Sequence, residues 1–111
     1  MSDTITLPAI PKPRLEERTK RQPPYNVVLL NDDDHTYEYV MLGLCKVCGC
    51  SMDTAFALAQ TIDHTGRAVV WTGCLEVAEL KRDQIRGLGP DFWAEQRVDY
   101  PLGVVLEPLP G

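Results

Sequence analysis

The sequence predicts an α+β fold, in which a small, mostly antiparallel, three-stranded sheet carries three helices on one face. Short apolar runs predict the strands, at residues 27–30, 67–72 and 102–107. Apolar residues that recur at helical spacing between these runs predict the three helices. The predicted order is β-α-α-β-α-β, which is typical of a sheet covered by helices on one side.

The length and composition predict one globular domain. The 111 residues suffice for a single modest core, and 44% hydrophobic and 24% charged residues are typical of ordinary soluble proteins. No apolar run approaches the roughly 20 residues of a membrane span, and the N-terminus lacks the apolar stretch of a signal peptide. We therefore expect a cytoplasmic protein without membrane contact, and a monomer as the simplest state.

Charge divides the chain into two parts. Residues 1–24 hold five Lys/Arg and three acids, which leaves six basic and thirteen acidic residues in 25–111. Phosphate binding needs the opposite balance, so we expect no nucleic-acid partner. Five of the nine prolines also lie in residues 1–24, which predicts a mobile N-terminal extension before a core domain of residues 25–111. The sequence leaves open whether the extension is a passive leader or a tether to a partner.

The first predicted strand runs directly into acid. The apolar run Val27–Leu30 is followed by Asn31 and then by Asp32, Asp33 and Asp34. Three adjacent carboxylates repel one another, and a simple turn needs only one Asp or Asn with Gly. The excess of acid at the end of a buried strand therefore suggests a receptor for a cation.

The first predicted helix spans residues 36–48. His35 or Thr36 is a suitable N-cap, and Gly49 is placed to end the helix in a left-handed conformation. Its apolar stripe consists of Tyr37, Val40, Met41, Leu44, Cys45 and Cys48.

The second predicted helix lies between its N-cap, Ser51, and Gly66. Its apolar stripe consists of Met52, Ala55, Phe56, Ala59 and Ile62. Asp63 continues this stripe, where an unpaired charge is costly, so it either has a partner or reaches solvent at the helix end. His64 is expected to be a cation near the helix C-terminus rather than a ligand or base.

The third predicted helix spans residues 75–88 and is stopped by Gly89-Pro90. The residues expected to face inward are Val77, Leu80, Ile85 and Leu88. The segment 89–101 that follows carries Pro, Gly and charge around Phe92 and Trp93, which predicts a loop with an aromatic anchor.

The four cysteines allow one alternative function. Cys45, Cys48, Cys50 and Cys74 have a spacing that can supply a tetrahedral thiolate site for zinc. Against this, Cys45 and Cys48 lie on an apolar stripe, where free cysteine behaves as a small buried hydrophobe. We expect neither a metal nor a cofactor, and no disulfides in a chain without a secretion signal.

A small enzyme is the other alternative, since the three adjacent acids with Asp63 and His64 resemble an acid/base or metal-hydrolase cluster. Adjacent carboxylates alternate in direction, however, and the chain has neither a nucleophile motif nor a Gly-rich phosphate loop. We therefore expect no enzymatic activity.

Four motifs follow one another at nearly gapless spacing up to Lys81. They are VVLLNDD at 27–33 with Glu38 and Val40, Gly66–Val69, Glu76–Glu79 with Lys81, and Pro101-Leu102. In this order, from about Tyr25 to Glu107, the chain resembles the ClpS family. These are adaptors that deliver N-degron proteins to a Clp AAA+ unfoldase and its peptidase.

The resemblance implies a non-enzymatic protein that holds the first residue of a substrate chain, typically Leu, Phe, Tyr or Trp. It implies that Asn31 and Asp33, with Asp32 nearby, bind the free α-amino group. An ammonium group has three donors and needs acceptors that converge on it. The residues implied to line the apolar pocket are His35, Tyr37, Val40, Ala59, Ile62 and Leu102.

Four positions depart from the family pattern. Asp63 stands where many members have a His that contacts the α-amino group, and Tyr37, Ala59 and His35 replace the usual Met at the rim, Met deeper in the pocket and Thr. A shift of one residue would place His64 rather than Asp63 at the His position. We expect Asp63 to strengthen the grip on the ammonium, and Tyr37 with Ala59 either to favour Phe, Tyr or Trp over Leu or merely to repack the core.

The resemblance also implies the partner, the N-terminal domain of a ClpA- or ClpC-like unfoldase. Glu76 and Lys81 match positions that face this domain, although their pattern alone predicts only a solvated helix face. Residues 1–24 match the mobile extension through which such adaptors engage the unfoldase.

Overall fold

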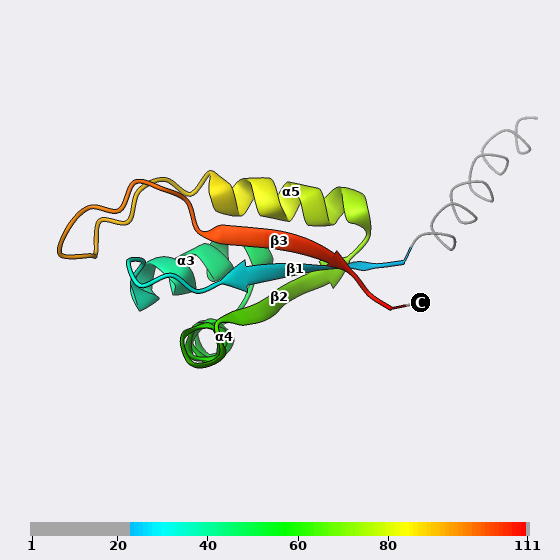
Figure 1. The fold of residues 1–111 in the computed structure, drawn as a ribbon, viewed down its shortest axis with the longest axis horizontal. Helices are drawn as coiled ribbons and strands as arrows, with labels where there is room; N and C mark the ends of the chain where they lie inside the picture. The colour runs from blue at the N-terminus through cyan, green and yellow to red at the C-terminus, as the bar shows by residue number, and fades with distance from the viewer. Residues whose placement is uncertain (1–22, 111) are drawn as a thin grey trace, which may run out of the picture.

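A computed structural model describes residues 23–110, and it confirms the predicted fold class and order of elements (Figure 1). The strands are β1 (Tyr25–Leu30), β2 (Arg67–Gly73) and β3 (Gly103–Pro108), and the helices are α3 (Tyr37–Cys48), α4 (Met52–Thr65) and α5 (Leu75–Arg86). The predicted mobile extension covers residues 1–24, of which residues 1–22 lie outside the part that the structure describes.

The sheet has the order β2-β1-β3, and both pairings are antiparallel. The strand that leads into the acidic residues is therefore the central one. Val28 lies opposite Val69 of β2 and Val105 of β3, and a bulge in the pairing with β2 falls between Val27 and Val28. Because β1 is hydrogen-bonded along both edges, its carboxyl end is held in place from both sides.

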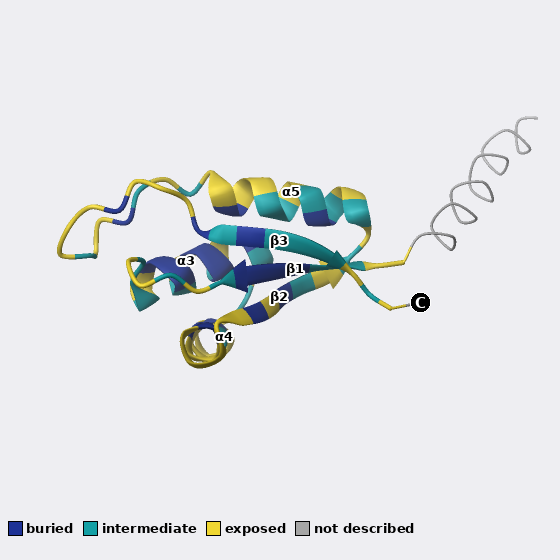
Figure 2. Ribbon diagram, in the orientation of Figure 1, coloured by how far each residue is buried: buried dark blue, intermediate teal, exposed yellow. Residues whose placement is uncertain are grey.

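Side chains that alternate along the strands build the core on one face of the sheet. Val27 is 0% and Leu29 1% exposed, and both belong to one cluster with Ala68 and Val70 of β2 and with Val104 of β3. The helices cover this face: α5 contacts β1 and β3, α4 contacts β2, and α3 lies between the two other helices. Figure 2 shows β1 and much of α3 as buried, whereas the outer turns of α4 and α5 are exposed.

The predicted caps begin and end the first two helices. The Thr36 side chain accepts a hydrogen bond from the Tyr39 backbone, and Ser51 does the same for Thr54. Gly49 and Gly66 follow α3 and α4 in the left-handed region, with φ of 71° and 92°. The caps at both ends of both helices agree with the prediction, so α3 and α4 have their expected lengths.

Three residues that were predicted to face inward are exposed instead. Leu80 of α5 is 52% exposed because that helix buries Ala78 and Ile85, and Leu80 lies two residues, or about 200°, around from Ala78. Met52 and Phe56 are 51% and 44% exposed, because α4 covers only the β2 side of the sheet and flanks α3 (Figure 1). The third helix also ends two residues early, at Arg86.

The opposite face of the sheet is crossed by an ion pair. Arg67 of β2 donates to Glu107 of β3, so the two side chains pass over β1 at Val28, which is 0% exposed. Hydrogen bonding and charge raise the pKa of Arg67 and lower the pKa of Glu107.

Within residues 23–110, no helix is long and apolar enough to cross a membrane.

Candidate functional site

The predicted binding residues come together around two adjoining hollows at the carboxyl end of β1. The larger, of about 150 Å³, is lined by Asn31, Asp32, Asp33, His35, Thr36, Tyr37, Val40, Ala59, Ile62 and Asp63. A smaller one of about 20 Å³ shares five of these residues and adds Leu102. We call the two together the β1 pocket. All ten residues predicted to bind an amino-terminal residue therefore share one site, although their individual roles remain predictions.

Asp32 shapes the acidic loop, which we define as residues 31–36. Its Oδ1 accepts hydrogen bonds from the backbone of Asp34 at 2.9 Å and of His35 at 2.8 Å, and its Oδ2 lies 2.6 Å from Nδ1 of His35. Burial alone would raise the pKa of Asp32, but these hydrogen bonds and the nearby imidazole outweigh it and lower that pKa. Asp32 is therefore occupied within its own loop.

Asn31 and Asp33 are the exposed members of the acidic loop that line the β1 pocket. The backbone of Asn31 donates to the carbonyl of Gly66 at 2.9 Å, which ties the loop to the end of α4. This contact places Asn31 and Asp33 beside the last turn of α4, from which Asp63 projects. Oxygen atoms from two separate elements thus surround one hollow.

Tyr37 and Asp63 meet across the pocket. The Tyr37 hydroxyl donates to Oδ2 of Asp63 at 2.9 Å, and the Tyr37 ring lies 5.9 Å from that of Phe56. The partial burial and the acceptor carboxylate raise the pKa of Tyr37. Asp63 was expected either to have a partner or to reach solvent, and it does both: it accepts from Tyr37 and it is exposed. His64 is exposed in the last turn of α4 and does not line the pocket.

The apolar wall of the pocket combines three elements. Val40 of α3, Ile62 of α4 and Leu102, just before β3, are between 5% and 8% exposed. Ala59 of α4 is 4% exposed and is the smallest of the side chains that line the larger hollow. A wall of this kind suits a large apolar side chain whose polar end stays near the acidic loop.

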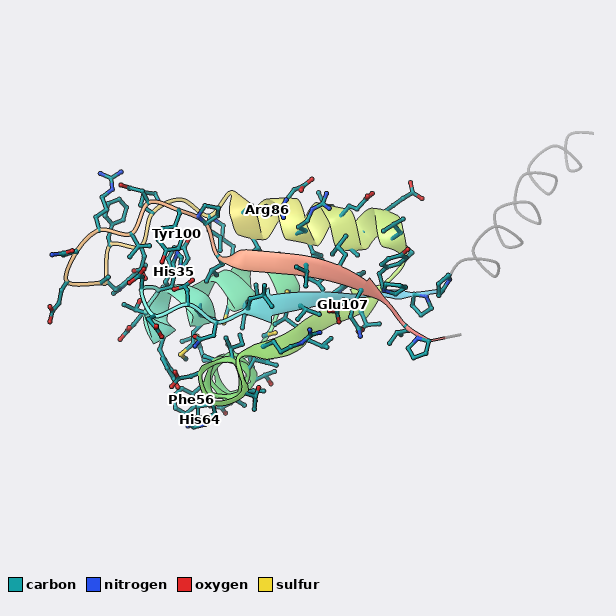
Figure 3. The ribbon with its side chains drawn as sticks, in the orientation of Figure 1. His35, Phe56, His64, Arg86, Tyr100 and Glu107 are labelled. Carbon is teal, nitrogen blue, oxygen red and sulfur yellow. The ribbon has the colours of Figure 1, made fainter. Side chains whose placement is uncertain are left out.

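His35 lines both hollows of the β1 pocket, but its ring makes polar contacts. Its side chain is 2% exposed, yet both ring nitrogens have polar partners: Asp32 at Nδ1 and, at 3.0 Å from Nε2, the Tyr100 carbonyl. Figure 3 shows His35 and Tyr100 together where α3 meets the long loop, far from Phe56 and His64 on α4. His35 therefore links the acidic loop to residues 65 positions later.

That later segment is a part of the site that the sequence did not reveal. Residues 87–102, which we call the aromatic loop, contain Asp91, a carboxylate with 0% exposure. Asp91 accepts hydrogen bonds from the Thr36 backbone at 2.7 Å, from the Thr36 hydroxyl and from the Trp93 backbone at 2.9 Å. The Tyr100 hydroxyl donates to Asp34, which helps to raise the pKa of Tyr100 to about 12. The acidic loop is thus held by the aromatic loop from behind.

The two residues predicted to face an unfoldase lie on α5, away from the pocket. Glu76 is exposed in the first turn of the helix. Lys81 is half-buried, and its Nζ donates to the Val47 carbonyl at 2.7 Å and lies 5.9 Å from the centre of the Trp71 ring. Lys81 therefore satisfies one of the last carbonyls of α3.

We expect Lys81→Met to lower the free energy of unfolding by about 1 kcal/mol, because the apolar stem remains but the charged hydrogen bond to Val47 is lost. Chemical denaturation would measure this change. Lys46→Met is the matched control, since Lys46 is an exposed cation in the last turn of α3, the helix that contains Val47. Equal effects of the two substitutions would contradict a specific role for Lys81.

The cysteines do not form the thiolate site that their spacing allowed. Among the residues that the structure describes, no three His, Cys, Asp or Glu side chains are placed to hold a metal ion. Burial, with a smaller contribution from Cys50, raises the pKa of Cys48 to about 11, which keeps this thiol protonated. Cys45 contacts the sulfur of Met52 at 3.3 Å, as expected for a packed cysteine.

Comparison with known proteins gives a consistent answer. The family model described as ATP-dependent Clp protease adaptor protein ClpS matches residues 20–99. The Clp protease adapter protein ClpS of Ruegeria sp. is 41% identical over 90 residues, which cover 81% of this chain and 74% of that protein. The ClpS of Thermosynechococcus vestitus is 35% identical over 81 residues, or 72% of this chain and 86% of its own.

A solved structure agrees with these relatives in fold. Agrobacterium tumefaciens ClpS2 bound to L-phenylalaninamide matches with a TM-score of 0.68 and 34% sequence identity. The match covers 80% of this chain and all of the other. Sequence and structure comparisons thus agree over nearly the whole described region.

Proposed function

Because the chain belongs to the ClpS family of Clp protease adaptor proteins, we propose that it binds N-degron substrates and delivers them to a Clp AAA+ unfoldase. It binds the free α-amino group together with a bulky hydrophobic first residue, Leu, Phe, Tyr or Trp. It is an adaptor and catalyses no reaction itself.

The oxygen atoms around the β1 pocket support recognition of the α-amino group. Asn31 and Asp33 lie on the acidic loop and Asp63 on the end of α4, so acceptors approach one position from two elements. An α-ammonium is a compact cation with three donors, which suits acceptors in this arrangement. In this proposal Asn31, Asp33 and Asp63 contact the ammonium, while Asp32 holds the loop.

The apolar wall supports recognition of the first side chain. A bulky side chain that fills the space beside Val40, Ile62 and Ala59 gains about 25 cal/mol per Å² of apolar area removed from water. The related ClpS2 was solved with L-phenylalaninamide, a molecule that has a free α-amino group and an aromatic side chain. We assign the same class of ligand to this pocket.

The walls of the pocket support a preference among first residues. Ala59 is small, which leaves depth for a ring, and Tyr37 is held at the rim by its hydrogen bond to Asp63. We therefore propose that Phe, Tyr and Trp bind more tightly than Leu, and that β-branched Ile and Val are excluded.

The partner is the N-terminal domain of a ClpA- or ClpC-like unfoldase. The exposed face of α5 that carries Glu76 supports this assignment, and it lies apart from the β1 pocket. Lys81, predicted for the same contact, is half-buried, and its Nζ donates to the Val47 carbonyl. We propose that the protein acts as a monomer in the cytoplasm.

The convergence of Asn31, Asp33 and Asp63 on one apolar-walled pocket carries the proposal. We expect labelled peptides that begin with Phe, Tyr, Trp or Leu to bind in fluorescence anisotropy, and their N-acetylated twins to bind at least tenfold more weakly. Acetylation removes the cation and leaves the side chain, and one charged hydrogen bond corresponds to about a tenfold change in affinity.

Peptides that begin with Ala or Ile serve as the side-chain controls in this experiment. Binding that is insensitive to acetylation, or no binding of any peptide, would show that the β1 pocket is not a receptor for a chain's amino terminus.

A further inference from the structure

The ring of His35 faces two hydrogen-bond acceptors. Nδ1 lies 2.6 Å from the Asp32 carboxylate and Nε2 lies 3.0 Å from the Tyr100 carbonyl oxygen. A neutral imidazole has one N–H donor and one acceptor nitrogen, so it can satisfy only one of these partners. The other nitrogen would then place its lone pair against an oxygen in a site where the side chain is 2% exposed.

The alternative, a protonated Asp32 that donates to a neutral ring, does not fit the surroundings of this carboxyl. Oδ1 of Asp32 accepts two backbone hydrogen bonds, from Asp34 at 2.9 Å and from His35 at 2.8 Å, and these favour the ionised carboxylate whatever the state of the imidazole. Asp32 is therefore an ionised acceptor, and the proton between the two side chains belongs to the ring.

The groups around the ring also favour a cation. The Tyr39 ring stacks on His35 with ring centres 4.9 Å apart. An aromatic face attracts a cation that lies against it. The acids around this cluster are Asp32, in direct contact with the ring, Asp34, which accepts from the Tyr100 hydroxyl, and Asp91, which accepts from the Thr36 backbone next to His35.

We propose that His35 is a positioning residue that carries both ring protons in the folded protein and, as this cation, fixes Asp32 and the acidic loop against the aromatic loop. Tyr100, in the aromatic loop, thereby becomes part of the receptor for the amino terminus without touching the ligand. This inference rests on the proposed function only in its consequence for binding, because the protonation of His35 follows from the contacts alone.

A protonated His35 changes which of the carboxylates can attract the ammonium group of a ligand. The charge of Asp32 is balanced by His35, so Asp32 adds little net attraction for a ligand's ammonium. The exposed Asp33 and Asp63 then supply that attraction. His35 acts on affinity indirectly, by holding the loop that presents Asn31 and Asp33.

Nuclear magnetic resonance of the imidazole nitrogens tests the protonation directly. The chain has two histidines, so His64→Gln leaves a single set of ring signals, and the wild-type protein supplies His64 as an exposed reference. At about pH 7.5, where an exposed imidazole is mostly neutral, we expect both nitrogens of His35 to bear a proton. One unprotonated nitrogen in His35 would overturn the proposal.

Peptide binding tests the positioning role. We expect His35→Gln to weaken binding of a Phe-initiated peptide about tenfold, since a charged hydrogen bond at each nitrogen is lost or weakened. His64→Gln should bind as the wild type does. If the wild-type protein binds the peptide and His35→Gln binds it with the same affinity, the positioning role is refuted.

The two experiments separate this inference from the proposed function. If the wild-type protein binds no peptide, the proposed function fails, while the nitrogen signals still decide the state of His35. If His35→Gln does not give a cooperative thermal transition, the decision rests on the wild-type and His64→Gln spectra, which need no change at His35.

Discussion

Replacing Asp63 with asparagine is expected to weaken binding of a Phe-initiated peptide by about 30-fold. The amide keeps the shape and one acceptor oxygen but removes the charge, and hydrogen bonds to charged groups contribute about 1.5–3 kcal/mol. Asn31, Asp33 and Asp63 line the same hollow, so the substitution changes one of the three groups that we propose to contact the ammonium. Fluorescence anisotropy at fixed ionic strength would measure the change.

Two further variants control the interpretation of Asp63→Asn. Asp53→Asn removes a charge from the first turn of the same helix, far from the pocket, and should change affinity less than twofold if long-range electrostatics are screened. Tyr37→Phe removes the hydroxyl that donates to Asp63 and leaves the carboxylate in place. Asp63→Asn and Asp53→Asn with equal affinities would show that Asp63 does not contact the ligand.

Replacing Asp91 with alanine is expected to lower the free energy of unfolding by about 3 kcal/mol. The carboxylate is fully buried and accepts hydrogen bonds from the backbones of Thr36 and Trp93. Its removal would leave these N–H groups without an acceptor, and each buried unsatisfied group costs about 1–3 kcal/mol. Urea denaturation monitored by tryptophan fluorescence would give the value.

Asp99→Ala is the matched control for Asp91→Ala. Asp99 belongs to the same aromatic loop, and its ion pair with Arg97, at 2.7 Å, lies in solvent. Exposed ion pairs contribute about 0–1 kcal/mol, so little change is expected. If both substitutions cost the same, Asp91 would not be the anchor of the aromatic loop.

The parts of the fold that depend on local sequence were predictable. The helices α3 and α4 begin and end at the predicted cap residues, which are Thr36, Ser51, Gly49 and Gly66. These ends were predictable because a cap acts on residues within one helical turn. The positions of the acidic residues were predictable in the same way, since they directly follow β1 and Asp63 interrupts a helical stripe, whereas their role in binding stays a prediction. Burial patterns failed at Leu80 because hydrophobicity alone does not say which side of a helix the sheet occupies.

The aromatic loop was not predictable because its role depends on partners distant in sequence. Asp91 completes the cap of α3 from 55 residues away, and Tyr100 meets His35 from 65 residues away. Nothing in the local pattern around Asp91 distinguishes a buried acceptor from a turn residue. His35 was placed in the pocket by its position after the acids, but its bond to the Tyr100 carbonyl required the fold.

The place of β1 in the sheet has a mechanical consequence. The strand begins at Tyr25, just after the N-terminal segment, and ends at Leu30, just before the acidic loop, with a paired strand on each side. Tension between the N-terminal segment and a ligand held at Asn31 and Asp33 would therefore act along the axis of β1. Antiparallel hydrogen bonds run perpendicular to the strands, so this force would shear the hydrogen bonds of both β1 pairings at the same time. The bonds would then have to break together rather than one after another, which makes the domain resistant to such a force.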